Sequence, residues 1–382
     1  MNVKPAVLKR LLLVCLLIGG LTVTACFGQV KKDSSVTVTD GTVIYETPMA
    51  YELMHIALAL TDTSIEANGY RVYNEIINTT SDYYKEVMKH FAPYKEHALI
   101  KELNKALRKS AGRYLSNLQL AYCSEFVANS IVKEKNFPLI HRMAYRVFSV
   151  NRKQLNDFAR VSGFAAFYQQ HQKLYQTTLH DVQQYADVNR QKIWLEKEFP
   201  RRYACYNIVV SPLMGGTHFM KRFKQQGNYA SIMWVSKFNY EKVNALTKAL
   251  YTGVVMTEID HGYVNPVSNH YKRTLKKIMG KENRVNWTGG GPSNSYKTGY
   301  KVFNEYMTHA AYLLYVGERL TADEWQGLEK SKIISMENNR KFIKFGAFYT
   351  TLKALYTARK NNETIADFYP AMIEWCIKEN SQ

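Results

Sequence analysis

Apolar and aromatic residues recur at three- or four-residue spacing along most of this chain, and this spacing constrains the fold more than any other feature. Between Pro48 and about Pro200, stripes such as Tyr83, Val87 and Phe91 place apolar side chains on one face of a helix. The period changes between Tyr203 and Phe238, where β-branched and aromatic runs take over. The pattern therefore predicts long helical regions around a short β segment.

Two runs in that segment, Tyr206–Val210 and Ser231–Val235, are typical of strands separated by a turn at Gly215–Gly216. We expect these strands to supply an edge that pairs with an extended peptide. Closer to the N-terminus, Asp40–Gly41 lies between two β-prone runs and predicts a hairpin, because this pair tolerates the positive φ of a type I′ turn. The predicted fold class is α+β, mostly helical, with a small sheet.

Three signals organise the C-terminal half. Helical spacing resumes at Tyr240 and is expected to end at Asn265–Pro266, because proline cannot donate the next helical hydrogen bond. A further helix is predicted over about Ser295–Gly317, and Thr321 with Glu324 forms a capping box that begins the C-terminal helices. The glycines before Pro292 follow no strand and precede no phosphate-loop lysine, so no nucleotide site is predicted.

The N-terminal segment Met1–Gly28 has the three-part pattern of a secretory signal: a basic start, an apolar run and small residues. The sequence before Cys26 is similar to a lipobox, which predicts lipidation of Cys26 and a membrane-anchored lipoprotein of a Gram-negative bacterium. Cleavage after Ala25 or Gly28, giving an exported periplasmic protein without an anchor, stays open as the alternative.

The formal net charge is +19, which first suggests a nucleic-acid partner. The basic residues are scattered and the chain is predicted to be exported, so we expect no nucleic acid. A general attraction to anionic surfaces or substrates is one interpretation, and a solvated basic surface is the other. The predicted mature chain has three widely spaced cysteines, which argues against a disulfide framework and a cysteine zinc site. They are Cys123, Cys205 and Cys376.

The segment around Glu258 and His261 carries the strongest chemical signal. In zinc peptidases, His-Glu-x-x-His on one helix places two imidazoles on one metal, and the glutamate activates the bound water. Here Glu258 takes the general-base position, His261 takes the second ligand position, and Thr257 stands where the first histidine would be. Glu305, on the next predicted helix, could supply a further zinc ligand. A simple helical Glu–His contact is the other interpretation.

Several stretches in order through the chain resemble the bacterial family of exported, gluzincin-like proteins called domain of unknown function 4932. They are Asn78–Tyr84, Phe91–Lys95, Val210–His218, Glu258–Pro266 and Asn304–Tyr306. The resemblance implies a zincin (gluzincin)-like metallopeptidase fold with an added N-terminal helical region. It also implies zinc-ligand positions at His261 and Glu305 and a general base at Glu258.

The chain departs from the family pattern at Thr257, because a neutral hydroxyl is a poor zinc ligand. His309, one turn after Glu305, is the first candidate for a replacement ligand, and His218 and His270 are further ones. The basic stretch between Lys272 and Arg284 could steer an acidic substrate.

The resulting hypothesis is an exported metallopeptidase-like protein that is either degenerate or a weak zinc-dependent peptide hydrolase with altered ligands. The alternatives are a non-catalytic binding lipoprotein for a peptide or acidic polymer, and a structural surface lipoprotein. The chain is divided into a signal peptide (1–28), a tether and hairpin (29–47), a helical region (48–200), a zincin-like core (201–320) and C-terminal helices (321–382).

Overall fold

The computed structural model describes residues 35–62, 66–67, 70–71, 76–110, 113–133, 151–216, 218–225, 228–236 and 244–381. The predicted signal segment and Cys26 lie outside these residues. Within the described part, no helix is both long and apolar enough to cross a membrane.

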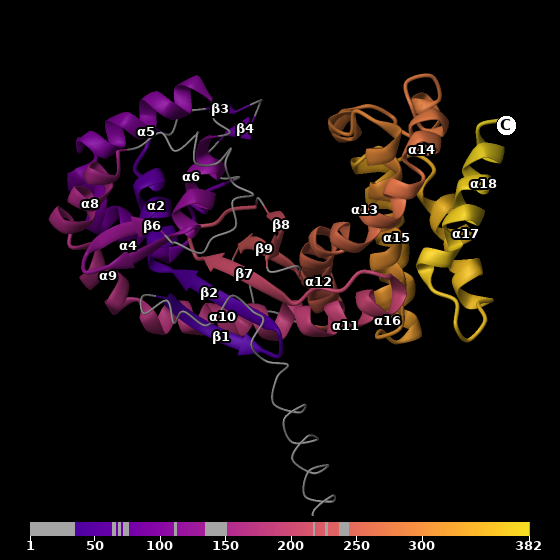
Figure 1. Ribbon diagram of the computed structural model, residues 1–382, viewed down its shortest axis with the longest axis horizontal. Helices are drawn as coiled ribbons and strands as arrows, with labels where there is room; N and C mark the ends of the chain where they lie inside the picture. Colours follow the sequence, from indigo (N-terminus) through magenta and orange to yellow (C-terminus); the bar gives the residue numbers. More distant parts are fainter. Residues whose placement is uncertain are drawn as a thin grey trace, which may run out of the picture.

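Among the described residues, five strands form one mixed sheet with the order β1-β2-β7-β9-β8 (Figure 1). The three inner strands are parallel, and each outer strand pairs antiparallel with its neighbour. The strands are β1 (Ser35–Asp40), β2 (Val43–Pro48), β7 (Cys205–Ser211), β9 (Asn228–Ser236) and β8 (Phe219–Gln225). Two small hairpins lie apart from it, β3 (Glu66–Ala67) with β4 (Tyr70–Arg71) and β5 (Ser124–Val127) with β6 (Ser130–Lys133).

The predicted α+β class, mostly helical with a small sheet, is confirmed. Both predicted strands exist as β7 and β9, and the predicted hairpin exists as β1 and β2. Its two-residue turn is Gly41–Thr42, one position later than expected, and Gly41 has the positive φ of 58°. The prediction that β7 and β9 supply a free edge is wrong, because each has a strand on both sides. Among the described strands the two edges are β1 and β8, and the sequence pattern missed β8.

The sheet is buried on both faces, so alternate residues of its strands enter two different cores. Tyr206, Ile208 and Val210 of β7 face one core, while Cys205 and Val209 face the other. The second core is covered by the earlier helices, which lie on one side of the sheet in Figure 1. These helices are α2 (Met49–Ala59), α4 (Asp82–Phe91), α5 (Ala98–Lys109), α6 (Arg113–Tyr122), α8 (Arg152–Val161) and α9 (Phe164–Gln170).

The first core is covered by the later part of the chain. Helix α10 links the two cores, because Tyr175 packs in one and Leu179 in the other. The helices are α10 (Gln172–Ala186), α11 (Val188–Glu198), α12 (Ala245–Ile259), α13 (His261–His270), α14 (Lys272–Ile278), α15 (Gly299–Gly317), α16 (Ala322–Ile334), α17 (Phe345–Thr357) and α18 (Tyr369–Glu379). The hairpin of β1 and β2 was predicted as a separate segment, but it is part of the central sheet, because β2 pairs with β7.

Local signals place several helices well. The stripe of Tyr83, Val87 and Phe91 is the buried face of α4, and Thr321 with Glu324 forms the predicted capping box of α16. The predicted stop at Asn265–Pro266 is wrong, because Pro266 lies inside α13. The missing proline N–H leaves the carbonyl of Gly262 without its usual helical donor, and the Tyr203 hydroxyl donates to that oxygen at 3.2 Å.

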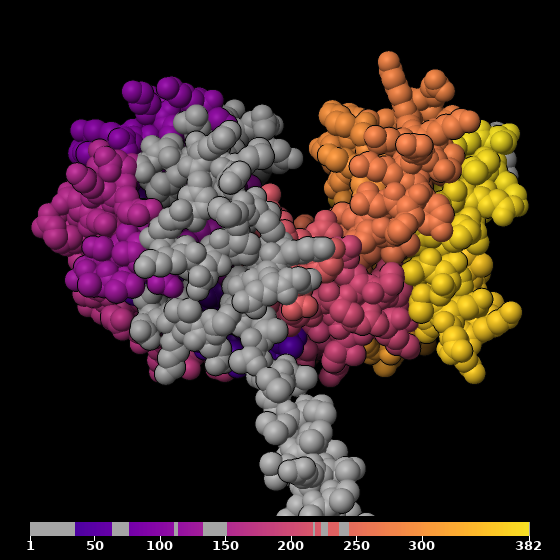
Figure 2. Space-filling view, in the orientation of Figure 1, coloured from indigo at the N-terminus to yellow at the C-terminus, as the bar shows by residue number. Residues whose placement is uncertain are grey.

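A hollow separates the part of the molecule that carries α5 and α6 from the part that carries α13 and α14 (Figure 2). Strands β8 and β9 lie between these two parts in Figure 1. The β8 edge of the sheet is therefore close to the hollow, and α13 lies on the other side of the hollow.

Close packing of α12 on α15 gives a prediction for stability. A Cβ added to Gly253 would lie 2.7 to 2.9 Å from two ring carbons and the hydroxyl oxygen of Tyr312. Gly253→Ala should therefore lower the free energy of unfolding by about 1–3 kcal/mol, the usual effect of overpacking a core. Urea denaturation followed by circular dichroism measures this change.

The matched control is Gly327→Ala in α16, where an added Cβ meets nothing within 4 Å. That variant should be more stable by roughly 0.5–1 kcal/mol, because alanine favours a helix over glycine. Equal effects of the two substitutions would contradict the α12–α15 packing.

Candidate functional site

The predicted motif helix is broken inside the motif. Thr257 and Glu258 lie in the last turn of α12, whereas His261 is the first residue of α13. At the break, the carbonyl of Asp260 accepts from the N–H groups of both Tyr263 and Val264, each at 2.8 Å. The sequence pattern predicted that Glu258 and His261 share one straight helix. That prediction is wrong, because the two residues lie on different helices.

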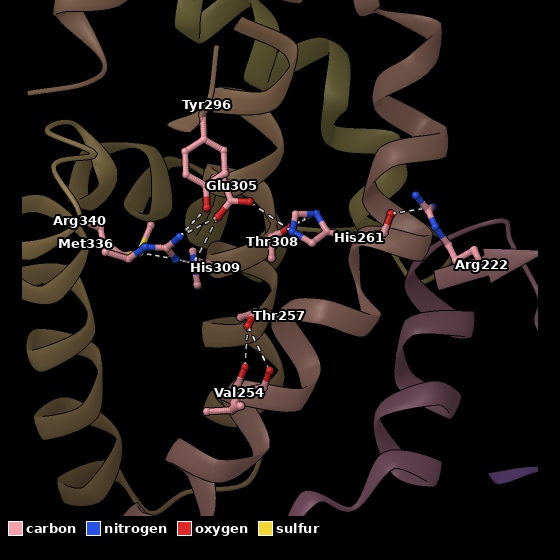
Figure 3. Close-up of polar contacts among 11 residues, drawn as sticks. Arg222, Val254, Thr257, His261, Tyr296, Glu305, Thr308, His309, Met336 and Arg340 are labelled. Atoms are coloured by element: carbon pink, nitrogen blue, oxygen red, sulfur yellow. Dashed lines mark hydrogen bonds and ion pairs between the residues drawn. The ribbon is translucent and has the colours of Figure 1, made fainter. Parts of the chain in front are cut away.

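The start of α13 is held by contacts from the sheet side. Arg222 of the edge strand β8 donates to the carbonyl of His261 at 3.0 Å (Figure 3). The residue after His261 must be a glycine, because a Cβ added to Gly262 would lie 2.6 Å from the hydroxyl oxygen of Tyr203. Strand β8 and helix α13 are thus fixed to each other beside His261.

His261 and Glu305 meet although they are far apart in the sequence. The His261 Nε2 atom is 3.2 Å from Oε1 of Glu305, and its Nδ1 is 3.4 Å from the Thr308 hydroxyl oxygen (Figure 3). Glu305 and Thr308 lie on α15, whose residues from Val302 to Val316 are all buried. Two ligand atoms of one tetrahedral zinc are roughly 3.3 Å apart. The distance between His261 and Glu305 is therefore one that two zinc ligands could have.

The second carboxylate oxygen of Glu305 faces an arginine. Arg340 Nη2 lies 3.1 Å from Glu305 Oε2 and donates to the Tyr296 hydroxyl at 2.8 Å. Arg340 Nη1 contacts Nε2 of His309, and that nitrogen is 3.7 Å from Glu305 Oε2. Both carboxylate oxygens are therefore engaged, one by His261 and the other by Arg340.

Thr257 does not replace the absent histidine. Its hydroxyl donates to the carbonyl of Gly253 at 2.8 Å, so it bonds to its own helix (Figure 3). Glu258 is largely buried and has no hydrogen bond or ion pair with any residue that the structure describes. His218 precedes β8, His270 is exposed at the end of α13, and no described contact joins either to His261 or Glu305.

The electrostatics of the cluster follow from burial and close charges. Burial by itself would lower the pKa of His261, but the hydrogen bond and charge of Glu305 outweigh it and raise that pKa to about 9. Burial by itself would raise the pKa of Glu305, but His261 and Arg340 together hold that pKa below the ordinary value. Burial lowers the pKa of His309 well below its usual range, so His309 is neutral and accepts from Arg340.

Two further groups belong to the cluster. Asp260 is fully buried, and neither carboxylate oxygen has a hydrogen-bond partner among the described residues. Burial raises the pKa of Asp260 well above its usual range, which favours the neutral acid. Burial also lowers the pKa of Lys332 to about 8, and its ammonium group lies 5.2 Å from the centre of the Tyr312 ring. Sequence reasoning missed these two residues as well as Arg340.

The described side chains do not fit a zinc site. In the described part of the chain, no group of three or more His, Cys, Asp or Glu residues is arranged to hold a metal ion. His261 and Glu305 supply two ligands, Thr257 is bonded to its helix, and the guanidinium of Arg340 lies against Glu305. A catalytic zinc normally has three protein ligands and one water.

Comparison with known proteins gives no relative for this chain. No family model matches it, and no curated protein and no solved structure is significantly similar to it. The site must therefore be interpreted from its own geometry.

The raised pKa of His261 predicts a pH dependence. Because the folded pKa of about 9 is above the ordinary 6.5, the charged imidazole contributes stability fully below about pH 6.5. That contribution is lost as the pH rises through about 9. An NMR titration of the imidazole should therefore show His261 titrating near pH 9.

Glu305→Gln should lower the pKa of His261, because it removes the carboxylate that stabilises the cation. Glu282→Gln is the matched control, since Glu282 is exposed and has no ion pair among the described residues. A wild-type His261 that titrates at or below pH 6.5 would show that the ion pair does not form.

Proposed function

We propose that this protein is an exported, non-catalytic relative of the metallopeptidases that binds an extended acidic peptide in the hollow beside β8. A zincin-like scaffold is part of the proposal. It is supported by the mixed sheet with an antiparallel edge strand, and by helices that bring His261 and Glu305 together.

The observation that carries the non-catalytic part is the engagement of both Glu305 oxygens. His261 takes one oxygen, Arg340 takes the other, and Thr257 is turned into its own helix. Metal-assisted hydrolysis needs an open coordination position for water beside a bound metal. These contacts favour a binding protein over a weak hydrolase with altered ligands.

The edge strand supports the choice of an extended ligand. Among the residues that the structure describes, strand β8 pairs with β9 alone, and an exposed edge can add a peptide strand through main-chain hydrogen bonds. The second feature is the hollow of Figure 2, near which β8 and β9 lie in Figure 1.

A cavity marks one end of this region. Its volume is about 380 Å³, and its lining includes Asn78, Thr80, Gly216 and Ser236. Two stretches noted in the sequence meet there, because the Asn78 N–H donates to the carbonyl of Leu213 at 2.8 Å. Strand β8 has seven residues, which at about 3.4 Å each give an edge of roughly 24 Å, long enough for about six extended residues of a peptide.

Charge supports an acidic ligand. Lys221 is exposed on β8, and α14 contributes Lys272, Arg273, Lys276 and Lys277 without an ion pair to any described residue. A field of one sign raises the local concentration of oppositely charged ligands, and salt weakens it.

Peptide binding can be measured by fluorescence anisotropy with a labelled hexapeptide library of acidic, neutral and basic members. Acidic peptides should bind most tightly and lose affinity as salt is raised. Lys221→Glu should weaken acidic peptides by roughly tenfold, equivalent to about 1.4 kcal/mol. Lys330→Glu on α16 is the matched control, because Lys330 is exposed and unpaired among the described residues.

Equal binding of all peptides, or equal effects of the two lysine variants, would contradict the acidic-peptide site. No peptide should be hydrolysed. Hydrolysis that disappears in Glu258→Gln would instead establish the weak hydrolase. That outcome would refute the non-catalytic function even if acidic peptides bind.

Export and lipidation are tested separately. If Cys26 carries the lipid anchor, the wild-type protein should fractionate with membranes and Cys26→Ser should be released in soluble form. Cleavage without lipidation predicts that both proteins are soluble and exported.

A further inference from the structure

We infer that the guanidinium of Arg340 is the resident counter-cation of Glu305 and lies beside the position between His261 and Glu305 that a metal ion would take in a zinc peptidase. The inference goes beyond the peptide-binding function and does not depend on it. It states that the native ion pair and a zinc ion exclude each other at Glu305.

The first support is that Arg340 is held firmly in position. It follows a π-helical turn (Ser335–Asn339), and its N–H donates to the carbonyl of Ser335 at 2.9 Å. The next residues are anchored as well, because Phe342 is fully buried and the carbonyl of Lys341 accepts from Gly289 at 2.8 Å. A π-turn that aims one side chain is common at functional sites.

The second support is that the arginine makes contacts a metal would otherwise make. It lies 3.1 Å from Glu305, contacts the ring nitrogen of His309 and donates to the hydroxyl of Tyr296. Carboxylate and imidazole are also the side chains that zinc prefers. Arginine keeps its charge at every pH at which the protein is folded, so the counter-charge is permanent.

The third support is the charge that a metal would meet. A dication between His261 and Glu305 would stand close to the guanidinium, because both bind the same carboxylate group. Lys332 is also close enough for its charge to interact with Glu305 and Arg340. Like charges at such distances in a partly buried site repel strongly.

Loss of zinc binding therefore has two separate causes in this chain. One is the missing imidazole at Thr257, and the other is the added cation at Arg340. Thr257→His alone repairs only the first cause, whereas the double variant Thr257→His with Arg340→Gln repairs both.

The test uses Zn²⁺ alone with the full-length chain. Zinc per chain is measured by elemental analysis after dialysis, and affinity is measured by calorimetry. The wild-type protein and Arg340→Gln should retain no stoichiometric zinc. Thr257→His should bind weakly, and the double variant should bind one zinc about 100-fold more tightly than Thr257→His. A Co²⁺ complex of the double variant should show the absorption of a tetrahedral site.

Two comparisons isolate the charge. Thr257→His with Arg340→Lys keeps a cation and should bind zinc as weakly as Thr257→His. Thr257→His with Arg319→Gln is the matched control, because Arg319 is another partly exposed arginine beside a glutamate, 28% against 30%. Circular dichroism confirms folding, and Arg340→Met replaces Arg340→Gln if the latter does not fold.

The inference is overturned if the wild-type protein binds one zinc that is lost in His261→Ala. It is also overturned if neutralising Arg340 leaves the zinc affinity of Thr257→His unchanged. Neither outcome alters the peptide-binding measurement, so failure of this inference is distinguishable from failure of the proposed function.

Discussion

The buried, charged carboxylate of Glu305 must be compensated, and much of the local structure follows from this need. The residue lies on α15, whose buried length forms part of the larger core. An unpaired buried charge is strongly unfavourable, and breaking such a pair typically costs about 3–5 kcal/mol. The compensation comes from His261 at the start of α13 and from Arg340 after α16, so three segments converge on one side chain.

This convergence also explains why the helix break at Asp260 matters. An unbroken helix from α12 into α13 would continue in one direction, whereas the break sets the start of α13 beside both α15 and β8. The carbonyl of His261 is bonded to Arg222 and its side chain to Glu305. Strand β8 and the buried ion pair are thus connected through His261. A shift of the edge strand would be transmitted to Glu305 through the contacts of Arg222 with His261 and of His261 with Glu305.

Much of the fold could be predicted because it depends on local periodicity. The buried faces of α4 and α5 and the capping box of α16 need only residues within a few turns of each other. Strand β8 was missed because an edge strand buries little. Its Lys221 and Arg222 interrupt the apolar run that identifies inner strands such as β7. The effect of Pro266 was predicted wrongly, because the carbonyl that it leaves without a helical donor accepts a hydrogen bond from Tyr203, a residue far away in the sequence.

The candidate site was predictable only in part, for a related reason. The spacing of Glu258 and His261 is visible in the sequence, and Glu305 was found because it lies on the next strongly helical segment. Arg340 and Asp260 gave no such signal. The role of Arg340 comes from a contact 35 positions away, and that of Asp260 from burial without a partner. A motif identifies residues that could hold a metal, but it does not reveal which charge already occupies their neighbourhood. In this chain that charge is supplied by an arginine, and a guanidinium satisfies a carboxylate without activating a water molecule. The buried charge of Glu305 is therefore compensated by side chains of this chain, and the packing around it needs no bound metal.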